Sequence, residues 1–251
     1  MFQSWGVPVA GGLTLLGLYL LIGGRRFLTG GSVAAEYYEA IAMAVGIAFL
    51  VRTFMVEPFK IPSGSMIPTL LVGDYLFVNK FAYGYRLPFT HRRIGMSDPP
   101  HRGEIAVFEY PKDPAKDYIK RIIGLPGDRI LYRDKRLFVN GEPVAYRPDG
   151  IFRYYNEYEQ EVESQRLLET LGETPHAILV RGYTGPDPGF EDVVPAEHYF
   201  VLGDNRDNSN DSRFWGYVPA YRLVGRAVAL FWSWDRTAGK PRWERLGQAI
   251  R

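Results

Sequence analysis

A run of 23 uncharged residues at the amino terminus constrains this chain more than any other feature. Residues Phe2–Gly24 are rich in Leu, Val, Gly and Ala, and the basic pair Arg25–Arg26 follows them. A helix of that length extends about 34 Å, which is enough to cross the hydrocarbon core of a bilayer. A cleavable secretory signal would carry basic residues in front of its apolar run, and this chain has none there. The run therefore predicts a transmembrane helix over residues 1–24.

A second apolar segment, Ala40–Val51, follows closely. Twelve uncharged residues fit either a buried or interfacial helix or part of a membrane span. Arg52 can extend toward the headgroups, which would make residues 37–56 a second transmembrane helix. If both segments cross, the basic pair between them marks residues 25–36 as a short cytoplasmic loop. The chain after about residue 57 would then lie outside the cytoplasm.

The remainder of the chain predicts a mainly β domain. Asn140–Gly141 between two apolar runs is a strong hairpin signal, and Gly- and Pro-containing turns separate the other apolar runs. Many short strands of this kind are typical of an all-β barrel or sandwich. The expected strands are residues 74–78, 104–108, 118–123, 136–139, 198–202 and 226–232.

Two polar stretches are expected to contribute little to this domain. Residues 158–171 alone have a helical composition, and because they are polar we expect a peripheral helix or a disordered loop there. The tail after Asp235 is also polar, and we expect it to add little to the fold.

Charge balance and residue usage exclude several functions. The 30 basic and 28 acidic residues leave a formal charge of +2, without the basic run that nucleic-acid binding requires. The absence of cysteine excludes thiol nucleophiles, disulfides and thiolate metal sites. The four histidines are widely spaced, show no metal-ligand pattern, and are each expected at the surface or in a loop. The sequence therefore predicts no metal, no cofactor and no nucleic-acid partner.

A serine and a lysine are the strongest catalytic candidates. Ser63 and Ser65 flank a glycine within the proline-bracketed stretch Pro62–Thr69, which suits a nucleophile with one fixed direction but also suits an ordinary tight turn. A serine needs a base, and no Ser-His-Asp motif is recognisable. Lys120 lies in an apolar run, where desolvation would lower its pKa toward neutrality. The alternative is that Lys120 points outward from a half-buried strand.

A third stretch, Gly203–Arg213, alternates acidic, amide and hydroxyl residues. It fits a polar surface loop, and its spacing is similar to a calcium loop, but it lacks the terminal bidentate glutamate. The functional interpretation is a supporting shell of Asp–Arg pairs that fixes the geometry of a nucleophile and its base.

Taken in order, these stretches resemble the motifs of type I signal peptidases, membrane-bound Ser/Lys proteases that remove signal peptides from exported proteins. Several independent motifs match in order and spacing, and Lys80–Gly84 with Gly203–Ser209 resembles the Gram-negative branch in particular. The matching motifs are Glu57–Phe59, the Ser65 stretch, Gly73–Asp74, Lys80–Gly84, Arg102–Ile105, Tyr110–Pro111, Asp117–Arg121, Gly124–Asp128, Gly203–Arg213 and Val224–Arg226.

The resemblance implies a role for each site residue. Ser65 would be the nucleophile and Lys120 the general base, with the Ser65 backbone N–H and the Ser63 hydroxyl forming the oxyanion hole. Ser209 matches a serine that hydrogen-bonds and orients the lysine. The supporting ion pairs would be Asp211 with Arg213, and Asp204 with Arg121. Positions matching shallow apolar substrate pockets are Phe59, Ile61, Met66, Leu70, Tyr118 and Ile119.

The resemblance also implies a location, partners and a domain plan. It favours two membrane crossings in a bacterial inner membrane, with the catalytic domain on the periplasmic side and preprotein signal peptides as substrates. The export channel is a further possible partner. The preferred substrates would carry alanine or similar residues at positions −1 and −3. The expected parts are a catalytic β domain at 57–133 and 198–235, a variable β-rich insertion at 134–197, and a tail at 236–251.

Three alternatives stay open on the sequence. A Ser/Lys autoprotease of the LexA repressor type shares the expected β fold, but the apolar segments and the lack of a DNA-binding region disfavour it. A narrower peptidase devoted to one pilus or conjugation substrate is the second alternative. A catalytically silent membrane-tethered binding module is the third, and the joint presence of Ser63, Ser65, Lys120 and Ser209 disfavours it.

Overall fold

The computed structural model describes residues 2–3, 37, 40–41, 43–44, 56–86, 93–94, 98–156, 160–172, 174–182 and 189–250. The chain divides into two compact units, residues 3–57 and the remainder. Of the first predicted membrane segment, residues 1–24, only Phe2 and Gln3 are described; they form strand β1 rather than the expected helix, and the rest of the segment lies outside the described residues. The described residues of the second, at 37, 40, 41, 43 and 44, are helical. Within the described part of the chain, no helix combines the length and the apolar character needed for a membrane span.

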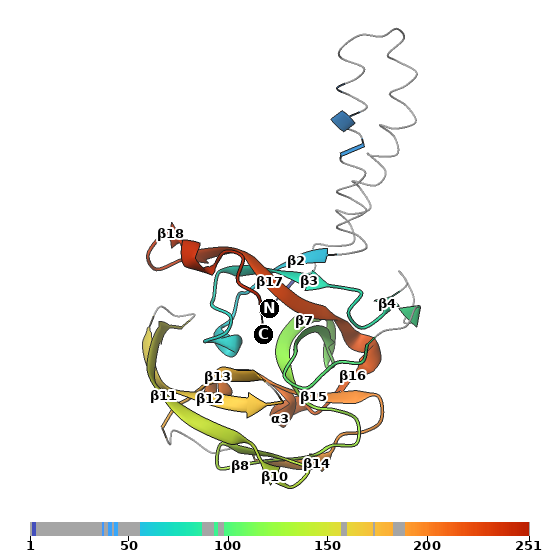
Figure 1. Cartoon of the computed structure of the whole chain (residues 1–251), viewed down its shortest axis with the longest axis vertical. Helices are drawn as coiled ribbons and strands as arrows, with labels where there is room; N and C mark the ends of the chain where they lie inside the picture. The colour runs from blue at the N-terminus through green and yellow to red at the C-terminus, as the bar shows by residue number, and fades with distance from the viewer. Residues whose placement is uncertain are drawn as a thin grey trace. The chain divides into compact units, whose positions relative to one another are not determined.

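The larger unit is mainly β, as predicted, and is built around one nine-stranded sheet (Figure 1). The sheet has the order β16-β15-β7-β6-β17-β3-β2, with β1 paired to β7 and β18 paired to β17. Its strands are β1 (Phe2–Gln3), β2 (Val56–Lys60), β3 (Asp74–Asn79), β6 (Ile105–Tyr110), β7 (Asp113–Gly124), β15 (His198–Leu202), β16 (Val218–Pro219), β17 (Leu223–Asp235) and β18 (Lys240–Pro241).

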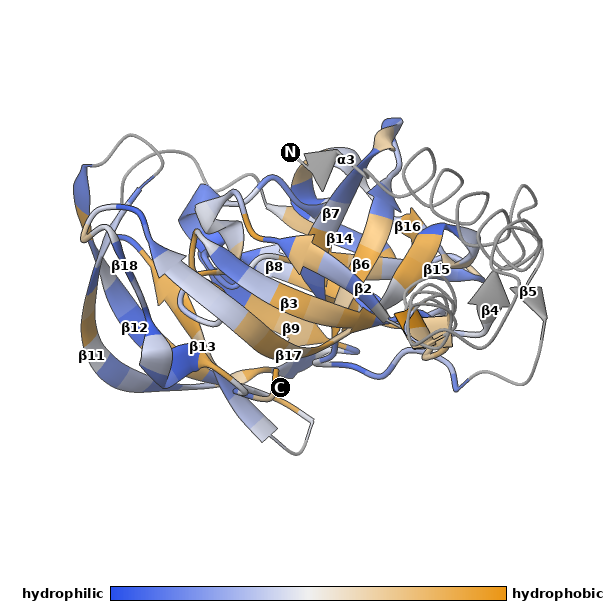
Figure 2. Ribbon diagram, turned by 90° about the horizontal axis from the view of Figure 1, so that it is seen from above, coloured by the Kyte–Doolittle hydropathy of each residue, from blue (hydrophilic) through white to orange (hydrophobic). Residues whose placement is uncertain are grey.

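Apolar residues on the central strands form the core of this sheet. β3 alternates buried and more exposed positions, as a strand with one face on the core must. β6 and β15 are mostly apolar, whereas β12 is mostly polar (Figure 2). One buried cluster joins β2, β3, β6, β7 and β17, and a second joins β6, β7, β15, β16 and β17. The long strands β7 and β17 thus contribute to both clusters and hold the sheet together.

Residues 134–197, here called the insertion, form most of two smaller sheets. One has the order β10-β9-β8-β14, the other β11-β12-β13. The predicted hairpin is confirmed, because Asn140 and Gly141 both have positive φ between paired β9 and β10. The strands are β8 (Arg129–Arg133), β9 (Arg136–Val139), β10 (Glu142–Pro143), β11 (Ala145–Tyr155), β12 (Glu161–Leu171), β13 (Thr174–Val180) and β14 (Phe190–Val193). A separate pair is β4 (Tyr85–Arg86) with β5 (Arg93–Ile94).

The helix or disordered loop expected over residues 158–171 is wrong. Residues Glu161–Leu171 are strand β12, which pairs with β11 on one side and β13 on the other. Its Glu, Gln and Leu residues favour a helix in isolation, but its backbone forms hydrogen bonds on both edges, with β11 before it and β13 after it. Tertiary context has therefore overridden local propensity.

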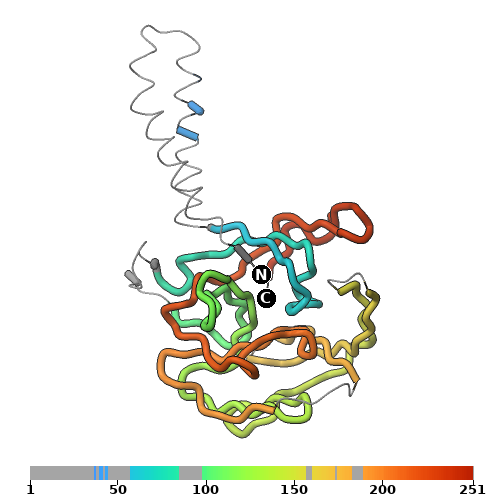
Figure 3. Tube along the Cα trace, turned by 180° about the vertical axis from the view of Figure 1, so that it is seen from behind, coloured from blue at the N-terminus to red at the C-terminus, as the bar shows by residue number. Residues whose placement is uncertain are grey.

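The expectation that the tail after Asp235 adds little is also wrong. Figure 3 shows this last segment, in red, beside the blue-green chain that begins the larger unit. Arg245 forms an ion pair of 2.6 Å with the fully buried carboxylate of Asp74, and Ile250 packs against the core. A buried carboxylate requires such partners, so the tail completes the fold.

Short helical turns connect the strands and carry functional residues. The turns are η3 (Gly64–Met66), η4 (Arg206–Asn208), α3 (Ser212–Trp215), η5 (Ala220–Arg222) and η6 (Trp243–Arg245). The first of them follows β2, and the second and third follow β15. These connections bring residues 64–66 and 203–213 to the same part of the larger unit.

Candidate active site

Ser65 lies in the single turn η3, between two extended residues. Ser63 before the turn and Ile67 after it both have extended backbone angles. The Ile67 N–H donates to the Gly64 carbonyl at 3.3 Å, which closes the turn. Ser65 is buried, at 7% exposure. The proline-bracketed stretch therefore holds the Ser65 hydroxyl in one direction at the end of β2.

Lys120 points into the protein from strand β7 and contacts Ser65. Its Nζ lies 2.7 Å from Ser65 Oγ and 2.9 Å from the Ile119 carbonyl, and the residue is 4% exposed. The alternative of an outward-pointing lysine is therefore wrong. A protonated Lys120 donates to Ser65, whereas a neutral Lys120 accepts the hydroxyl proton of Ser65 across the same contact. This distance is the geometry that a serine nucleophile and its base require.

Burial lowers the pKa of Lys120 far enough for its amine to act as a base near neutral pH. Removal from water disfavours the ammonium form and lowers its pKa to about 8, while the carboxylates of Asp211 and Asp204 oppose this shift. At pH 7 about a tenth of the molecules then carry a neutral amine. A lysine with the ordinary pKa would be neutral in only about one molecule in 3,000 at this pH.

The other two predicted serines also line the cavity that contains the pair. Ser63 Oγ is 3.4 Å from Ser65 Oγ, so both hydroxyls face the same space. Ser209 Oγ is buried and has no hydrogen-bond partner among the described residues. The described structure thus does not contain the contact from Ser209 to Lys120 that the family resemblance implies.

A cavity of about 570 Å³ opens on the Ser65–Lys120 pair. Of the six predicted substrate-binding positions, Tyr118 and Ile119 line this cavity. The other four are not among its lining residues: Phe59, Ile61, Met66 and Leu70 belong to a buried apolar cluster. The full lining is Ser63, Ser65, Asp117, Tyr118, Ile119, Lys120, Asp207, Asn208, Ser209, Asn210 and Phe214.

Residues 203–213, here called the catalytic loop, contain a buried Asp–Arg pair. Arg213 donates to Asp211 through Nε at 2.8 Å and through Nη2 at 2.9 Å. Asp211 also accepts the Gly203 N–H at 3.1 Å and the Arg213 N–H at 3.4 Å. The carboxylate that acts on the pKa of Lys120 is thus fixed by donors from both ends of the catalytic loop.

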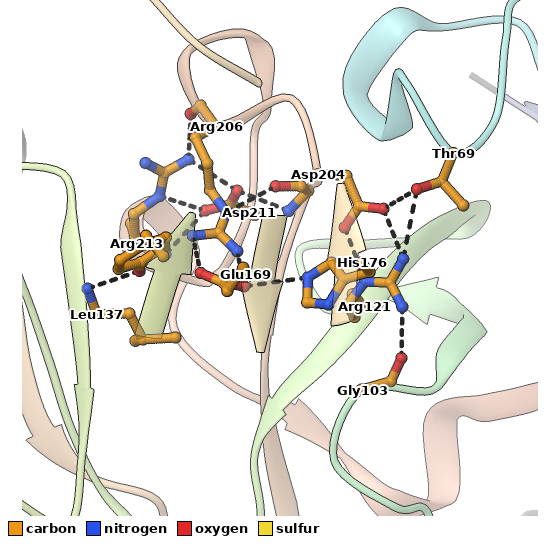
Figure 4. A network of polar contacts seen from close by, with 12 residues as sticks. Thr69, Gly103, Arg121, Leu137, Glu169, His176, Asp204, Arg206, Asp211 and Arg213 are labelled. Atoms are coloured by element: carbon orange, nitrogen blue, oxygen red, sulfur yellow. Dashed lines mark hydrogen bonds and ion pairs between the residues drawn. The ribbon is translucent and has the colours of Figure 1, made fainter. Parts of the chain in front are cut away.

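A second pair, Asp204 with Arg121, joins the catalytic loop to strand β7. Arg121 donates to Asp204 at 2.8 and 2.7 Å, and the Thr69 hydroxyl donates at 2.5 Å (Figure 4). Burial alone would raise the pKa of Asp204, but Arg121 holds it below its usual value. Arg121 follows Lys120 directly, so this ion pair positions the strand that carries the proposed base.

A third buried group, centred on Arg206, was not predicted from the sequence. Arg206 binds Glu169 of β12 through two bonds, and His176 of β13 lies 3.1 Å from the same carboxylate (Figure 4). The expectation of a surface or loop position is wrong for His176, which is 8% exposed. No motif marks Glu169 or His176, because their strands are recognisable only through pairing.

These contacts define the class of site: a serine hydroxyl within hydrogen-bond distance of a buried lysine amine, with no described histidine on the cavity. The family model described as "Signal peptidase, peptidase S26" matches residues 34–232. The chain belongs to this family.

Several curated relatives agree. The chain is 43% identical to the signal peptidase I of Pseudomonas fluorescens, with 84% of this chain and 78% of the relative covered. The identity to the signal peptidase I of Pseudomonas aeruginosa is also 43%, with the same coverage. The enzyme of Haemophilus influenzae is 34% identical, over 88% of this chain and 77% of that one. A crystal structure of a signal peptidase I from Enterococcus faecalis covers 51% of this chain and 97% of its own, with 27% identity and a TM-score of 0.31.

Proposed function

We propose that this protein is a serine endopeptidase that removes signal peptides from preproteins by a Ser65–Lys120 dyad. Its membership of the signal peptidase family supports the substrate class. The observation that carries the proposal is the 2.7 Å contact between Lys120 Nζ and Ser65 Oγ at the mouth of the cavity. This chemistry requires no bound group other than the substrate.

In the first step, neutral Lys120 takes the proton of Ser65 while Ser65 Oγ attacks the scissile carbonyl carbon. The oxyanion is bound by the Ser65 N–H and by the Ser63 hydroxyl, which lies 3.4 Å from the attacking oxygen. Collapse breaks the C–N bond, and Lys120 returns its proton to the leaving amine. Lys120 then takes a proton from the water that attacks the acyl-enzyme, and it gives this proton to Ser65 Oγ as the bond between that oxygen and the acyl carbon breaks and the product acid leaves.

The wall of the cavity supports a preference for small residues before the cut. Tyr118 stacks on Tyr110 with ring centroids 4.3 Å apart, so the wall beside Lys120 is rigid. A rigid wall close to the nucleophile excludes large side chains rather than attracting small ones. We assign alanine or a similar residue to substrate positions −1 and −3 on this basis. The substrate would bind extended, through backbone hydrogen bonds.

The amino-terminal apolar segments would place this site at a membrane. Phe2–Gly24 and residues 37–56 would cross twice, with residues 25–36 in the cytoplasm and the catalytic domain on the periplasmic side of a bacterial inner membrane. Signal peptides remain in that membrane after export, so a tethered peptidase meets its substrate there. Docking with the export channel would follow from the same placement.

Cleavage of a preprotein with an Ala-X-Ala site in detergent tests this function. We expect one cut after the second alanine, identified by the mass of the product, and no cut when the −1 alanine is replaced by a bulky residue. Self-cleavage alone would indicate an autoprotease, and no cleavage of any of several unrelated preproteins would contradict the proposal. Cleavage of only one among them would instead indicate a dedicated peptidase.

A further inference from the structure

One residue, Asn205, binds both peptide groups that flank the proposed nucleophile, one through its side chain and the other through its backbone N–H. Asn205 Nδ2 donates to the Gly64 carbonyl at 3.0 Å, and the Asn205 backbone N–H donates to the Ser65 carbonyl at 3.1 Å. Asn205 is completely buried. The two acceptors belong to the peptide groups on either side of the Ser65 Cα, so the two bonds together restrict the backbone rotation of Ser65.

The first of these bonds acts on the oxyanion donor itself. The Gly64 carbonyl and the Ser65 N–H are the two ends of one peptide group, and in a planar trans peptide they point in opposite directions. A donor on the carbonyl therefore fixes where the N–H points. It also polarises the group, which makes the N–H a stronger donor. The Ile67 N–H donates to the same carbonyl at 3.3 Å and therefore also helps to fix the orientation of this peptide group.

The insertion supplies the partner that holds this amide. The second hydrogen of Asn205 Nδ2 donates to the Tyr154 hydroxyl at 2.9 Å, and Tyr154 lies on strand β11. The Tyr154 oxygen also accepts from Arg181 at 3.0 Å. Because the Gly64 carbonyl can only accept a hydrogen bond, the nitrogen of the Asn205 amide must face it. The Tyr154 hydroxyl accepts the other hydrogen of that nitrogen. Tyr154 is itself buried, in a cluster that includes Ile67 of the nucleophile turn.

We propose that Asn205 and Tyr154 are positioning residues that orient the Ser65 N–H toward the oxyanion, so that the insertion contributes to catalysis. This inference rests on the proposed function. It adds two residues to the Ser65–Lys120 dyad, Asn205 from the catalytic loop and Tyr154 from the insertion. Tyr154 is 89 positions from Ser65 in sequence and does not line the cavity. Its influence on the reaction passes through Asn205.

The test compares Tyr154→Phe with Tyr155→Phe in the full-length protein. Both variants remove one hydroxyl from adjacent residues of β11, but Tyr155 is half exposed and points away from this contact. We expect Tyr154→Phe to lower kcat about tenfold with KM unchanged, because the affected donor binds the transition state. We expect Asn205→Ala to lower kcat further, and Tyr155→Phe to match the wild type.

Two readouts separate positioning from a loss of folding. A peptide aldehyde that forms a covalent adduct with Ser65 carries the oxyanion, so its affinity should fall with kcat, while that of an uncleavable ground-state peptide should not. Amide hydrogen exchange at Ile67 and Asn205 should accelerate about tenfold in Tyr154→Phe, since these N–H groups bond to the two carbonyls.

Each outcome decides a different point. Unchanged exchange in Tyr154→Phe would overturn the link from the insertion to the nucleophile turn. Faster exchange with unchanged kcat and aldehyde affinity would overturn the positioning role. An inactive wild type would contradict the proposed function instead, and the exchange experiment would still decide whether the link exists.

Discussion

Glu169 of the insertion and Arg206 of the catalytic loop form a two-point ion pair from which solvent is completely excluded. The two contacts measure 2.8 and 2.5 Å, and neither side chain has any exposed surface. Arg206 also donates to the Gly203 carbonyl at 3.2 Å. The carboxylate that fixes the middle of the catalytic loop thus comes from a strand of the insertion.

Loss of this carboxylate should destabilise the protein strongly. We expect Glu169→Ala to reduce the free energy of unfolding by about 3–5 kcal/mol, because Arg206 would remain buried without a counter-charge. Urea denaturation measures the effect. Glu163→Ala is the matched control, since Glu163 lies on the same strand in an exposed pair with Arg153 and should cost less than about 1 kcal/mol. Equal losses in the two variants would contradict the role of burial.

The rate of cleavage should rise with pH around the pKa of Lys120. Burial lowers this pKa to about 8, and only the neutral amine accepts a proton. We therefore expect kcat/KM to rise about tenfold per pH unit below pH 8 and to level off above it. A midpoint near 6.5 would point to a histidine, and a flat profile from pH 6 to 10 would contradict a lysine base.

Removal of the carboxylate that most strongly opposes the effect of burial on the Lys120 pKa should move that midpoint. Asp211 and Asp204 stabilise the protonated form of Lys120, which raises its pKa against the effect of burial. We expect Asp211→Asn to shift the midpoint of the kcat/KM profile to lower pH, with a lower plateau because Arg213 loses its partner. Asp207→Asn is the control, since Asp207 lines the cavity but is bound by Lys135. An unchanged midpoint in Asp211→Asn would refute this electrostatic coupling.

Burial of the Lys120 amine should lower the stability of the folded protein at neutral pH. Its pKa falls from 10.5 when unfolded to about 8 when folded, so the unfolded state binds the proton more tightly and the penalty is fully present below pH 8. We expect Lys120→Met to raise the free energy of unfolding at pH 7 by up to about 3 kcal/mol. This gain should disappear as the pH rises from 8 to 10.5. Denaturation of both proteins at pH 7 and pH 10 measures it, and a gain at pH 10 as large as the gain at pH 7 would argue against desolvation as the cause.

Local sequence signals predicted those strands and turns whose conformation is determined by their own residues. The Asn140–Gly141 hairpin is an example, because two residues with positive φ determine the turn without help from the rest of the fold. The runs at 74–78 and 198–202 correspond to β3 and β15 for a similar reason, since their apolar residues fit a buried strand in any context.

Features that depend on partners in other structural elements could not be predicted. Strand β12 has a helical composition and becomes a strand through its two neighbours. His176 has no motif, and it is buried because β13 places it beside Glu169. Arg245 lies in a polar tail in the sequence, and only the structure shows that it pairs with the buried carboxylate of Asp74. Sequence patterns locate a nucleophile and a base, but they do not reveal which residues hold them in place.

The central claim is that Ser65 and Lys120 together cleave a preprotein, and paired substitutions test it most directly. Cleavage of an Ala-X-Ala preprotein in detergent would be followed for the wild type, Ser65→Ala and Lys120→Ala, with unfolding temperatures recorded to show that each variant is folded. The dyad predicts that both folded variants lose cleavage by at least about 1000-fold. Cleavage by a folded Lys120→Ala protein at the wild-type rate would contradict the account and remove Lys120 as the base.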